Sequence, residues 1–385
     1  MSSINPSFNV HNNHQLQQRQ QNYVLDRKLL TVHSDDRDIC KWPYSNHFEI
    51  RIPEQYLNIQ SMRLVEVVMP ANYYTFSNQY QNTKLSFSVT PHDITDPFYS
   101  ALGSRTTPFQ IQIQDGFYCP EELVHELENR MNDVVRQWLA TEFLITTPEY
   151  DHMKVYYDNV AQKLWFGNTH ESFSLDFDVR QEYDLSNCEQ PVVWDQYTKW
   201  GLPSYLGFEK KKYAATEYIT PIKFQYVSGG TTWISPAAPS PPTAPVMPVY
   251  AVEAPLTIKI LGEKCIYMEV DKYNSYDELE PYSQHTSNMY NNDYNGRVDS
   301  AFAKIPITTA PHGEVFDSRN GFLQNVTHFE PPLERLQKLK FKFRYHDGRL
   351  VDFQDFPFNF TLEFNMLKNE IGKCYSVRVP HLYNL

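Results

Sequence analysis

The most regular feature of the sequence is an alternation of apolar and polar residues with a period of two. It is clearest near the C-terminus, where apolar Leu339, Phe341, Phe343 and Tyr345 alternate with Lys338, Lys340, Lys342 and Arg344. Such a pattern places apolar side chains on one face of a β-strand and polar ones on the other. Residues 346–349 supply a turn with Asp-Gly at its centre, and alternation resumes over 358–366. These residues predict a C-terminal β-hairpin.

Shorter segments of the same kind occur along most of the chain. We predict strands at 28–33, 48–52, 61–69, 85–89, 110–114, 155–157, 164–166, 173–177, 256–261, 266–270, 301–307 and 321–329. Aromatic residues make up 15% of the sequence, with 27 Tyr and 24 Phe against only 13 Gly. Because aromatic side chains suit half-buried pleated surfaces, this composition also favours a mainly β protein.

One segment has helical periodicity. Pro120 suits the first position of a helix, and Glu121 and Glu122 follow at the positive end of its dipole. An apolar stripe then consists of Leu123, Leu127, Met131, Val134, Val135 and Trp138. We interpret this stripe as facing the protein's own sheet, and a membrane or a partner is the alternative. The polar face, with Glu128, Asn132 and Arg136, is a candidate contact surface.

The pattern divides the chain into a β-domain with polar extensions. Residues 1–27 are rich in Gln and Asn and too polar to fold alone, so they form either a disordered leader or an arm ordered by a neighbouring subunit. The β-domain is expected over 28–370, with a helix-bearing insertion at about 105–215 and a C-terminal tail at 371–385. Residues 228–255 are proline-rich and predict a surface loop, or otherwise a recognition segment for an aromatic groove.

Charge and cysteine content narrow the functional classes. The net charge of −12 argues against nucleic-acid binding, which needs cations to neutralise phosphates. The row of Lys338, Lys340, Lys342 and Arg344 is then either a solvated strand face or a contact for an acidic patch of another subunit. The five cysteines are scattered without a Cys-x-x-Cys pair, which is typical of a reducing compartment. No apolar run is long enough for a transmembrane helix, so we expect synthesis in the cytosol.

Motifs for catalysis are missing from the sequence. It contains no Gly-x-Ser-x-Gly elbow, phosphate-binding loop, dinucleotide fingerprint or His-Glu-x-x-His. Asp35, Asp36 and Asp38 surround Arg37 and are interpreted as turn formers, and 291–296 lacks the last acidic ligand of a calcium loop. We therefore expect no enzyme activity, cofactor or metal. A pair of carboxylates on different strands remains open as a glycosidase-like alternative.

Several motifs in order resemble a known family. Residues 115–123, Asp-Gly-Phe-Tyr-Cys-Pro-Glu-Glu-Leu, resemble a helix start found in jelly-roll minor capsid proteins of nucleocytoplasmic large DNA viruses, such as chloroviruses and mimivirus-like relatives. In these proteins short strands and a Leu-Gly-Phe follow the helix, as Leu206-Gly207-Phe208 does in this sequence. Residues 34–38, 42–50, 302–306 and 336–364 also resemble these proteins. Cys119 departs from the pattern, in which Thr or Ser caps the helix.

This resemblance implies an antiparallel jelly-roll β-sandwich with one amphipathic helix in an insertion, or alternatively two jelly rolls. It also implies a structural minor capsid protein that bridges capsomers in an icosahedral shell and is located in the virion. The partners would be the major capsid protein and other minor capsid proteins, with possible self-association. A pentameric vertex protein of the same fold is the second reading. A carbohydrate-binding or hydrolysing β-sandwich is the third.

Overall fold

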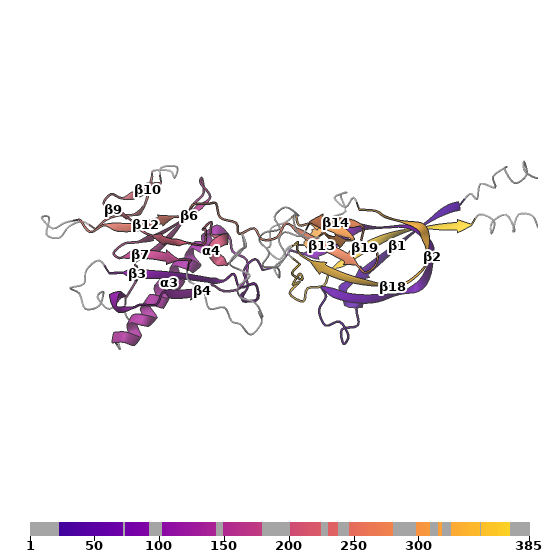
Figure 1. Cartoon of the computed structure of the whole chain (residues 1–385), viewed down its shortest axis with the longest axis horizontal. Coiled ribbons are helices and arrows are strands. Elements are labelled where there is room, and N and C mark those ends of the chain that lie inside the picture. Colours follow the sequence, from indigo (N-terminus) through magenta and orange to yellow (C-terminus); the bar gives the residue numbers. More distant parts are fainter. Residues whose placement is uncertain are drawn as a thin grey trace, which may run out of the picture. The chain divides into compact units, whose positions relative to one another are not determined.

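The computed structural model describes residues 23–71, 74–91, 102–143, 149–178, 201–224, 230–237, 246–279, 298–308, 315–317, 325–346 and 348–369. They form two compact units (Figure 1). Unit 1 contains the described residues of 23–71, 265–279 and 298–369, and unit 2 contains those of 74–264. Unit 1 is therefore built from segments near both ends of the chain. The segment that separates them, 73–264, is longer than the expected insertion at 105–215.

Unit 1 is organised around a seven-stranded antiparallel sheet. The strands are β1 (Tyr23–His33), β2 (His47–Pro70), β13 (Cys265–Val270), β16 (Ala303–Pro306), β17 (Val315–Asp317), β18 (Thr327–Arg344) and β19 (Asn359–Asn369). Their spatial order is β1-β19-β2-β18-β13-β16, and β17 pairs with the end of β2. A separate pair consists of β14 (Tyr276–Leu279) and β15 (Val298–Ala301).

Two unusually long strands bend this sheet. β2 has 24 residues and β18 has 18, whereas about 5–6 residues are usual for a strand. Their pairing register shifts between His328 and Leu333 and again between Leu336 and Lys338, and Asn58 has a φ of 52°. Such irregularities turn a strand from one layer into another. The N-terminal part of β2 pairs with β18, whereas β19 pairs with β2 only from Ile59 onward.

The bent sheet encloses an aromatic core. Phe341 of β18 contacts Phe360 of β19 with 4.9 Å between the ring centroids, and Tyr56 of β2 contacts Phe364 of β19 at 5.1 Å. Because β18 and β19 are not hydrogen-bonded neighbours, the contact between Phe341 and Phe360 shows two layers facing each other. The predicted apolar face of β18 is confirmed, since its residues Leu339, Phe341 and Phe343 are at most 1% exposed.

Unit 2 combines two four-stranded antiparallel sheets with a helix. One sheet has the order β4-β3-β7-β8, from β3 (Lys84–Thr90), β4 (Phe109–Gln112), β7 (Ser172–Asp176) and β8 (Lys212–Ala214). The other has the order β5-β6-β12-β9, from β5 (Met153–Asp158), β6 (Lys163–Asn168), β9 (Thr216–Tyr218) and β12 (Val249–Glu253). Buried residues of both sheets, such as Phe87 and Phe166, belong to one hydrophobic cluster.

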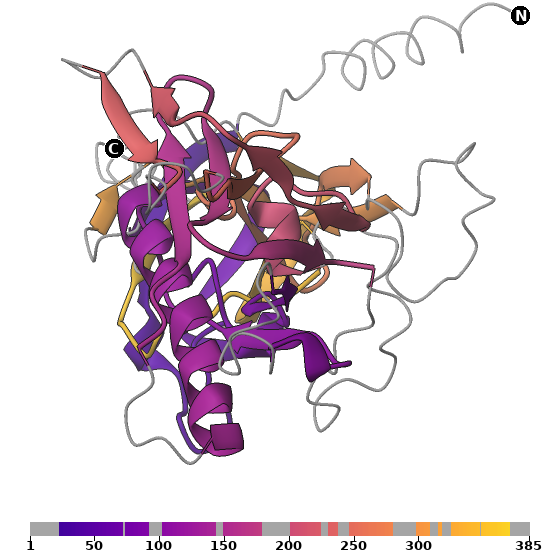
Figure 2. The ribbon, with the colours of Figure 1, turned by 90° about the vertical axis from the view of Figure 1, so that its left-hand side faces the viewer.

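Helix α3 (Pro120–Phe143) is the long magenta helix in Figure 2. It packs on this cluster with the stripe that the sequence predicts. Leu123, Leu127, Met131 and Val135 are fully buried in the cluster. Contacts with β4 and β5 show that the stripe faces the protein's own strands, as expected. The short helix α4 (Leu202–Tyr205) contributes further buried side chains next to Leu206 and Phe208.

A small hairpin covers part of the β5-β6-β12-β9 sheet of unit 2. It consists of β10 (Ile222–Phe224) and β11 (Thr231–Ile234). Phe224 stacks on Tyr156 with 4.2 Å between the ring centroids, and Trp165 and Trp233 complete the aromatic group. These rings cover one another and hold the hairpin on the sheet.

The predicted fold class is confirmed: the protein is mainly β, its sheets are antiparallel and helices are few. The predicted C-terminal hairpin is wrong. Tyr345 N–H donates to the carbonyl oxygen of Arg349 in a local turn, but β2 lies between β18 and β19. The chain returns beside β18 only as far as Val351, whose N–H donates to the carbonyl oxygen of Phe343. It then crosses to the other layer, where Phe353 and Phe358 are buried in the core.

Other strand boundaries also differ from those expected. Residues 256–261 form no strand, and β12 lies instead within the predicted proline-rich loop. Pro248 precedes β12, where its missing N–H removes no ladder bond, and β12 is buried between β6 and β9. β1 begins at Tyr23 rather than at 28, and the predicted strands 48–52 and 61–69 are parts of β2. Residues 1–22, 238–245, 291–296 and 371–385 lie outside the described residues.

Candidate contact surfaces

The polar face of α3 is occupied by contacts within unit 2. Asn132 is only 1% exposed, and its side-chain oxygen accepts a hydrogen bond from Met153 N–H at 3.1 Å. Its amide nitrogen donates to the carbonyl oxygens of Met153 and Glu128, each at 2.9 Å. The side-chain amide of Asn132 thus bonds to both the N–H and the carbonyl oxygen of Met153, as the backbone of a neighbouring strand would. Asn132 therefore fixes the start of β5 against the helix.

Glu128 and Arg136 lie on either side of Asn132 and have similar roles. Glu128 accepts a hydrogen bond from Val155 N–H at 3.0 Å and forms an ion pair with Lys154 at 3.2 Å. Arg136 Nε donates to the carbonyl oxygen of Tyr150 at 2.7 Å. The structure thus brings all three predicted residues together along residues 150–155. Asn132 is buried and presents no surface to another subunit. A contact of another subunit with the exposed parts of Glu128 and Arg136 stays a prediction.

The predicted basic row of β18 lies on the outer face of unit 1. The register places Lys338 opposite Arg51 and Lys340 opposite Glu49 of β2. Lys338 is 66% exposed at its side chain, and its ammonium lies 3.3 Å from Glu49. Lys342 is 40% exposed and lies 3.3 Å from Glu269 of β13. Carboxylates from both neighbouring strands therefore alternate with the lysines. Recognition of an acidic partner by this row stays a prediction.

An aromatic ring borders the basic row. The ammonium of Lys340 lies 5.3 Å from the ring centroid of Trp42, and that of Lys41 lies 5.5 Å from it. Arg37 holds this loop, because its guanidinium donates to the carbonyl oxygens of Ser34 and Trp42. Burial, together with the charges of Lys340 and Lys342, lowers the pKa of His47. Trp42 and His47 therefore lie beside lysine side chains at the border of the basic row.

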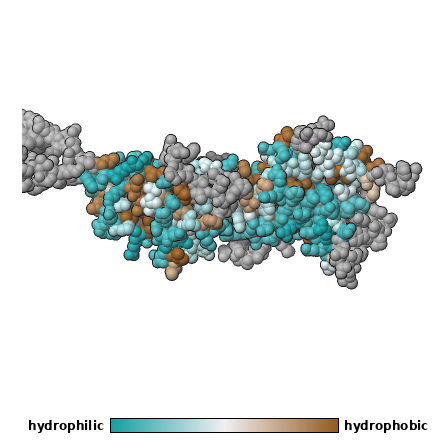
Figure 3. All heavy atoms as spheres, turned by 180° about the vertical axis from the view of Figure 1, so that it is seen from behind, coloured by the Kyte–Doolittle hydropathy of each residue, from teal (hydrophilic) through white to brown (hydrophobic). Residues whose placement is uncertain are grey.

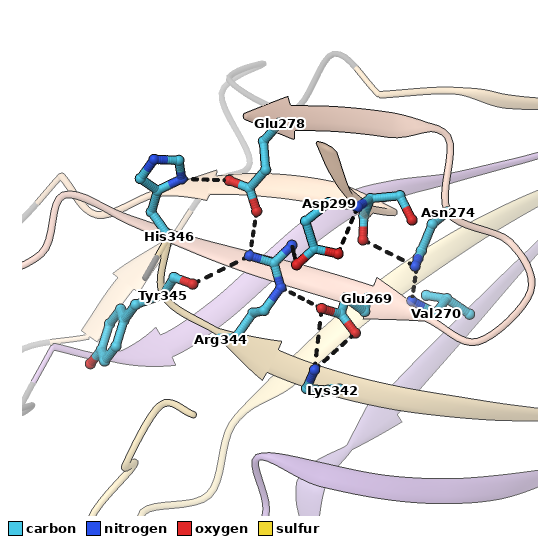
Figure 4. Close-up of polar contacts among 10 residues, drawn as sticks. Glu269, Val270, Asn274, Glu278, Asp299, Lys342, Arg344, Tyr345 and His346 are labelled. Carbon is cyan, nitrogen blue, oxygen red and sulfur yellow. Dashed lines mark hydrogen bonds and ion pairs between the residues drawn. The ribbon is translucent and has the colours of Figure 1, made fainter. Parts of the chain in front are cut away.

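Arg344, the fourth cation of the row, is not a surface residue. It is 1% exposed and forms ion pairs with Glu269, Glu278 and Asp299 (Figure 4). Burial lowers the pKa of Arg344, but its hydrogen bonds to the carboxylates of Glu269 and Glu278 raise it by more, so the guanidinium stays charged. Glu278 and Asp299 belong to β14 and β15. Arg344 therefore ties this strand pair to the main sheet.

Neighbouring polar groups complete the cluster around Arg344. His346 Nδ1 lies 2.8 Å from the second oxygen of Glu278 (Figure 4). Asn274 accepts a hydrogen bond from Val270 N–H at 2.8 Å and donates to the carbonyl oxygen of Ser300 at 3.2 Å. No sequence pattern marks Glu269, Glu278 or Asp299 as partners of Arg344. They lie far from Arg344 in the sequence, so only the fold reveals their role.

No group of three or more His, Cys, Asp or Glu side chains that would hold a metal ion occurs among the described residues. In the same part of the chain, no helix has the length and apolar character needed to cross a bilayer.

No protein-family model matches the sequence, and no curated protein matches it. Two solved structures show low similarity to the whole chain. Mavirus penton protein, labelled with selenomethionine, has 9% sequence identity and a TM-score of 0.38, over 90% of this chain and 100% of its own. A chain of the Sputnik virophage, determined by cryo-EM, has 10% identity and a TM-score of 0.38, over 90% of this chain and 99% of its own. Neither similarity is high enough to assign the chain to a family.

Proposed function

We propose that the protein is a non-enzymatic structural component of the icosahedral shell of a large DNA virus, where it bridges neighbouring capsomers. This proposal rests on where the structure places the sequence motifs that resemble those of minor capsid proteins. Their residues act as structural joints of the two β-units. The surfaces that these units present are then the functional parts of the molecule.

The motif at 115–123 connects three segments of unit 2. Gly116 and Phe76 exchange two backbone hydrogen bonds, at 2.8 and 2.9 Å. Asp115 accepts a hydrogen bond from Asn78 N–H at 3.0 Å. Cys119 N–H donates to the carboxylate of Glu122 at 3.2 Å, which is one half of a capping box at the start of α3. The motif thus joins a loop, β4 and the helix.

The other motifs have the same character. Leu206 and Phe208 are buried in unit 2, and Gly207 accepts a hydrogen bond from Leu256 N–H at 3.0 Å. In unit 1, Arg37 ties the β1–β2 connection together through Ser34 and Trp42, and residues 302–306 overlap β16. Motif residues with these roles support a scaffold that presents outer surfaces to other subunits.

The test is to locate the protein in purified virions. Quantitative mass spectrometry of particles, with labelled antibodies on intact and opened shells, would detect a shell component at fixed stoichiometry to the major capsid protein. Absence from washed particles would refute the proposal. The vertex alternative predicts closed pentamers, so native mass spectrometry of the purified protein distinguishes it from a bridging subunit.

The carbohydrate alternative requires an accessible aromatic platform. The group around Tyr156, Trp165, Phe224 and Trp233 is the strongest candidate among the described residues, but its rings pack against one another. Binding of the purified protein to a glycan array would support that reading. Lack of binding, together with incorporation into particles, would support the structural role.

A further inference from the structure

The first strand of unit 1 has a long, regular outer edge. β1 pairs with β19 along all 11 of its residues, from Tyr23 opposite Asn369 to His33 opposite Asn359, without a register shift. Among the described residues, no strand pairs with its other edge. β1 contains no proline and no bulge, which are common means of blocking pairing at such an edge. Its backbone is therefore suited to accept a further strand.

The outward side chains of β1 add apolar surface to this edge. Leu25 is 56% exposed and Leu29 is 58% exposed, and Arg27 lies between them with 59% of its side chain exposed. Figure 3 shows hydrophobic residues among hydrophilic ones on one face of the unit that contains β1, at its left. Two exposed leucines on one side of an open strand are typical of a contact for another chain.

The sequence of β1 is complementary to itself. If a second β1 runs antiparallel with Arg27 opposite the second copy's Arg27, then Leu25 faces the second copy's Leu29, and Leu29 faces its Leu25. On the other side of the strand, Asp26 and Lys28 face each other twice, with opposite charges. Each apolar and each charged pair thus occurs twice, as an isologous twofold contact requires.

We propose that β1 pairs antiparallel with β1 of a second copy in this register, so that the sheets of two subunits join across a twofold axis. The one unfavourable pair is Arg27 with its symmetry mate. Each Arg27 forms an ion pair with Glu363, which Arg63 also contacts at 3.0 Å. A carboxylate beside each guanidinium reduces their repulsion.

Charged substitutions test both the contact and its register. In the double variant L25K/L29K, lysines face each other twice across the contact. We therefore expect the dissociation constant of the dimer to increase at least about tenfold. In L25K/L29E, each lysine faces a glutamate, and we expect an affinity within about threefold of the wild type. L57K is the matched control, because Leu57 is 48% exposed on β2 of the same unit. Sedimentation equilibrium of the full chain gives the dissociation constants of the wild type and the three variants.

A cross-link provides a second readout. R27C places two thiols opposite each other across the twofold axis, so mild oxidation should produce a disulfide-linked dimer. L57C and the wild type, which retains Cys40 and the other native cysteines, give the background. A monomeric wild type would overturn the proposal, as would equal affinities of L25K/L29K and the wild type. A dimer that R27C does not cross-link would show a different interface.

Other occupants of the edge have distinct signatures. If a terminal segment of the same chain covers β1, the wild type stays monomeric and R27C is protected from alkylation. If another shell protein covers it, the wild type is monomeric and R27C reacts freely. Both outcomes contradict the twofold pairing. The test does not depend on the proposed shell function, since a dimer in solution and presence in particles are measured separately.

Discussion

At the scale of single residues, buried charges are neutralised by partners from distant strands. Arg344 is held by carboxylates of β13, β14 and β15, and Glu363 of β19 lies between Arg27 of β1 and Arg63 of β2. Glu363 is 4% exposed. A buried ion pair contributes little net stability, but removal of one partner is strongly destabilising because it leaves the other charge buried and unpaired. Both sites therefore connect strands that are far apart in the sequence.

Replacement of Arg344 by Met should lower the free energy of unfolding of unit 1 by about 3–5 kcal/mol, because Glu278 then remains buried without its guanidinium. The second substitution E278Q should recover part of this loss. K338M is the matched control, since Lys338 is exposed beside Glu49 and its loss should cost less than about 1 kcal/mol. Denaturant titration measures both. Equal losses for R344M and K338M would contradict the role given to Arg344.

Glu363 should make stability depend on pH. Burial raises the pKa of Glu363, but the hydrogen bond and charge of Arg63, together with the charge of Arg27, lower it by more, so it lies below 4.5. A lowered folded-state pKa stabilises the fold above the unfolded pKa, and the contribution disappears as the pH falls through the folded value. E363Q should therefore be less stable than the wild type at neutral pH.

The difference in the free energy of unfolding between E363Q and the wild type should narrow as the pH falls below about 4.5. The exposed variant E334Q on β18 controls for the general effect of removing one carboxylate. Denaturant titrations at a series of pH values provide the measurement. A gap between E363Q and the wild type that does not change with pH would refute the assignment.

At the scale of elements, the position of α4 depends on a close backbone approach. The segment after α4 is joined to residues 256–259, since Leu256 N–H donates to Gly207 O and Lys259 N–H donates to Tyr205 O. Gly207 has a φ of 90°, and a Cβ atom at this position would lie 2.2 Å from the carbonyl oxygen of Leu256. Only glycine meets both requirements.

G207A should therefore destabilise unit 2 through backbone strain and through the clash with Leu256. The matched control is G230A, because Gly230 also has a positive φ, of 67°, but a Cβ atom there would contact nothing within 4 Å. Strain alone costs about 1–3 kcal/mol, and we expect G207A to exceed G230A by at least about 2 kcal/mol. Thermal and denaturant unfolding measure the difference. Similar losses in the two variants would show that the close approach is not important.

At the scale of the whole molecule, each unit has its own hydrophobic core. The cluster around Phe341 and Phe360 contains residues of unit 1, and the cluster around Phe87 and Leu127 contains residues of unit 2. Charge is also unevenly distributed: residues 73–264 contain 14 Lys and Arg against 23 Asp and Glu, a net −9 of the total −12. The outer face of β18 in unit 1 is, by contrast, locally basic.

Because each unit has its own core, a substitution that destabilises one unit should reduce the protection of amide hydrogens from exchange in that unit alone. N132A removes the hydrogen bonds to Met153 and should cost about 2–3 kcal/mol. Hydrogen exchange should then accelerate in β5 and α3 of unit 2, whereas β2 and β19 of unit 1 keep wild-type rates. N129A, an exposed residue of the same helix, is the control. R344M should give the converse pattern. Equal acceleration in both units by either variant would contradict independent cores.

Local patterns were sufficient to predict part of this structure. The alternation along Leu339, Phe341 and Phe343 identified a buried strand face, and the stripe of Leu123 and Leu127 identified a packed helix that starts at Pro120. These features depend only on the two-residue period of strands and the 3.6-residue period of helices. Both periods can be seen in the order of residues within a single segment. The sequence by itself therefore determined the secondary-structure class and the buried side of the main elements.

Tertiary structure alone decided which elements meet. β18 pairs with β2 and β13 rather than with β19, and Arg344 at the end of a basic row is buried because strands about 45–75 residues earlier supply its carboxylates. Only the pairing of β1 with β19, at opposite ends of the chain, shows that β1 has an open edge. Strand partners lie far apart in the sequence and are selected by the packing of the whole sheet, so no local pattern specifies them.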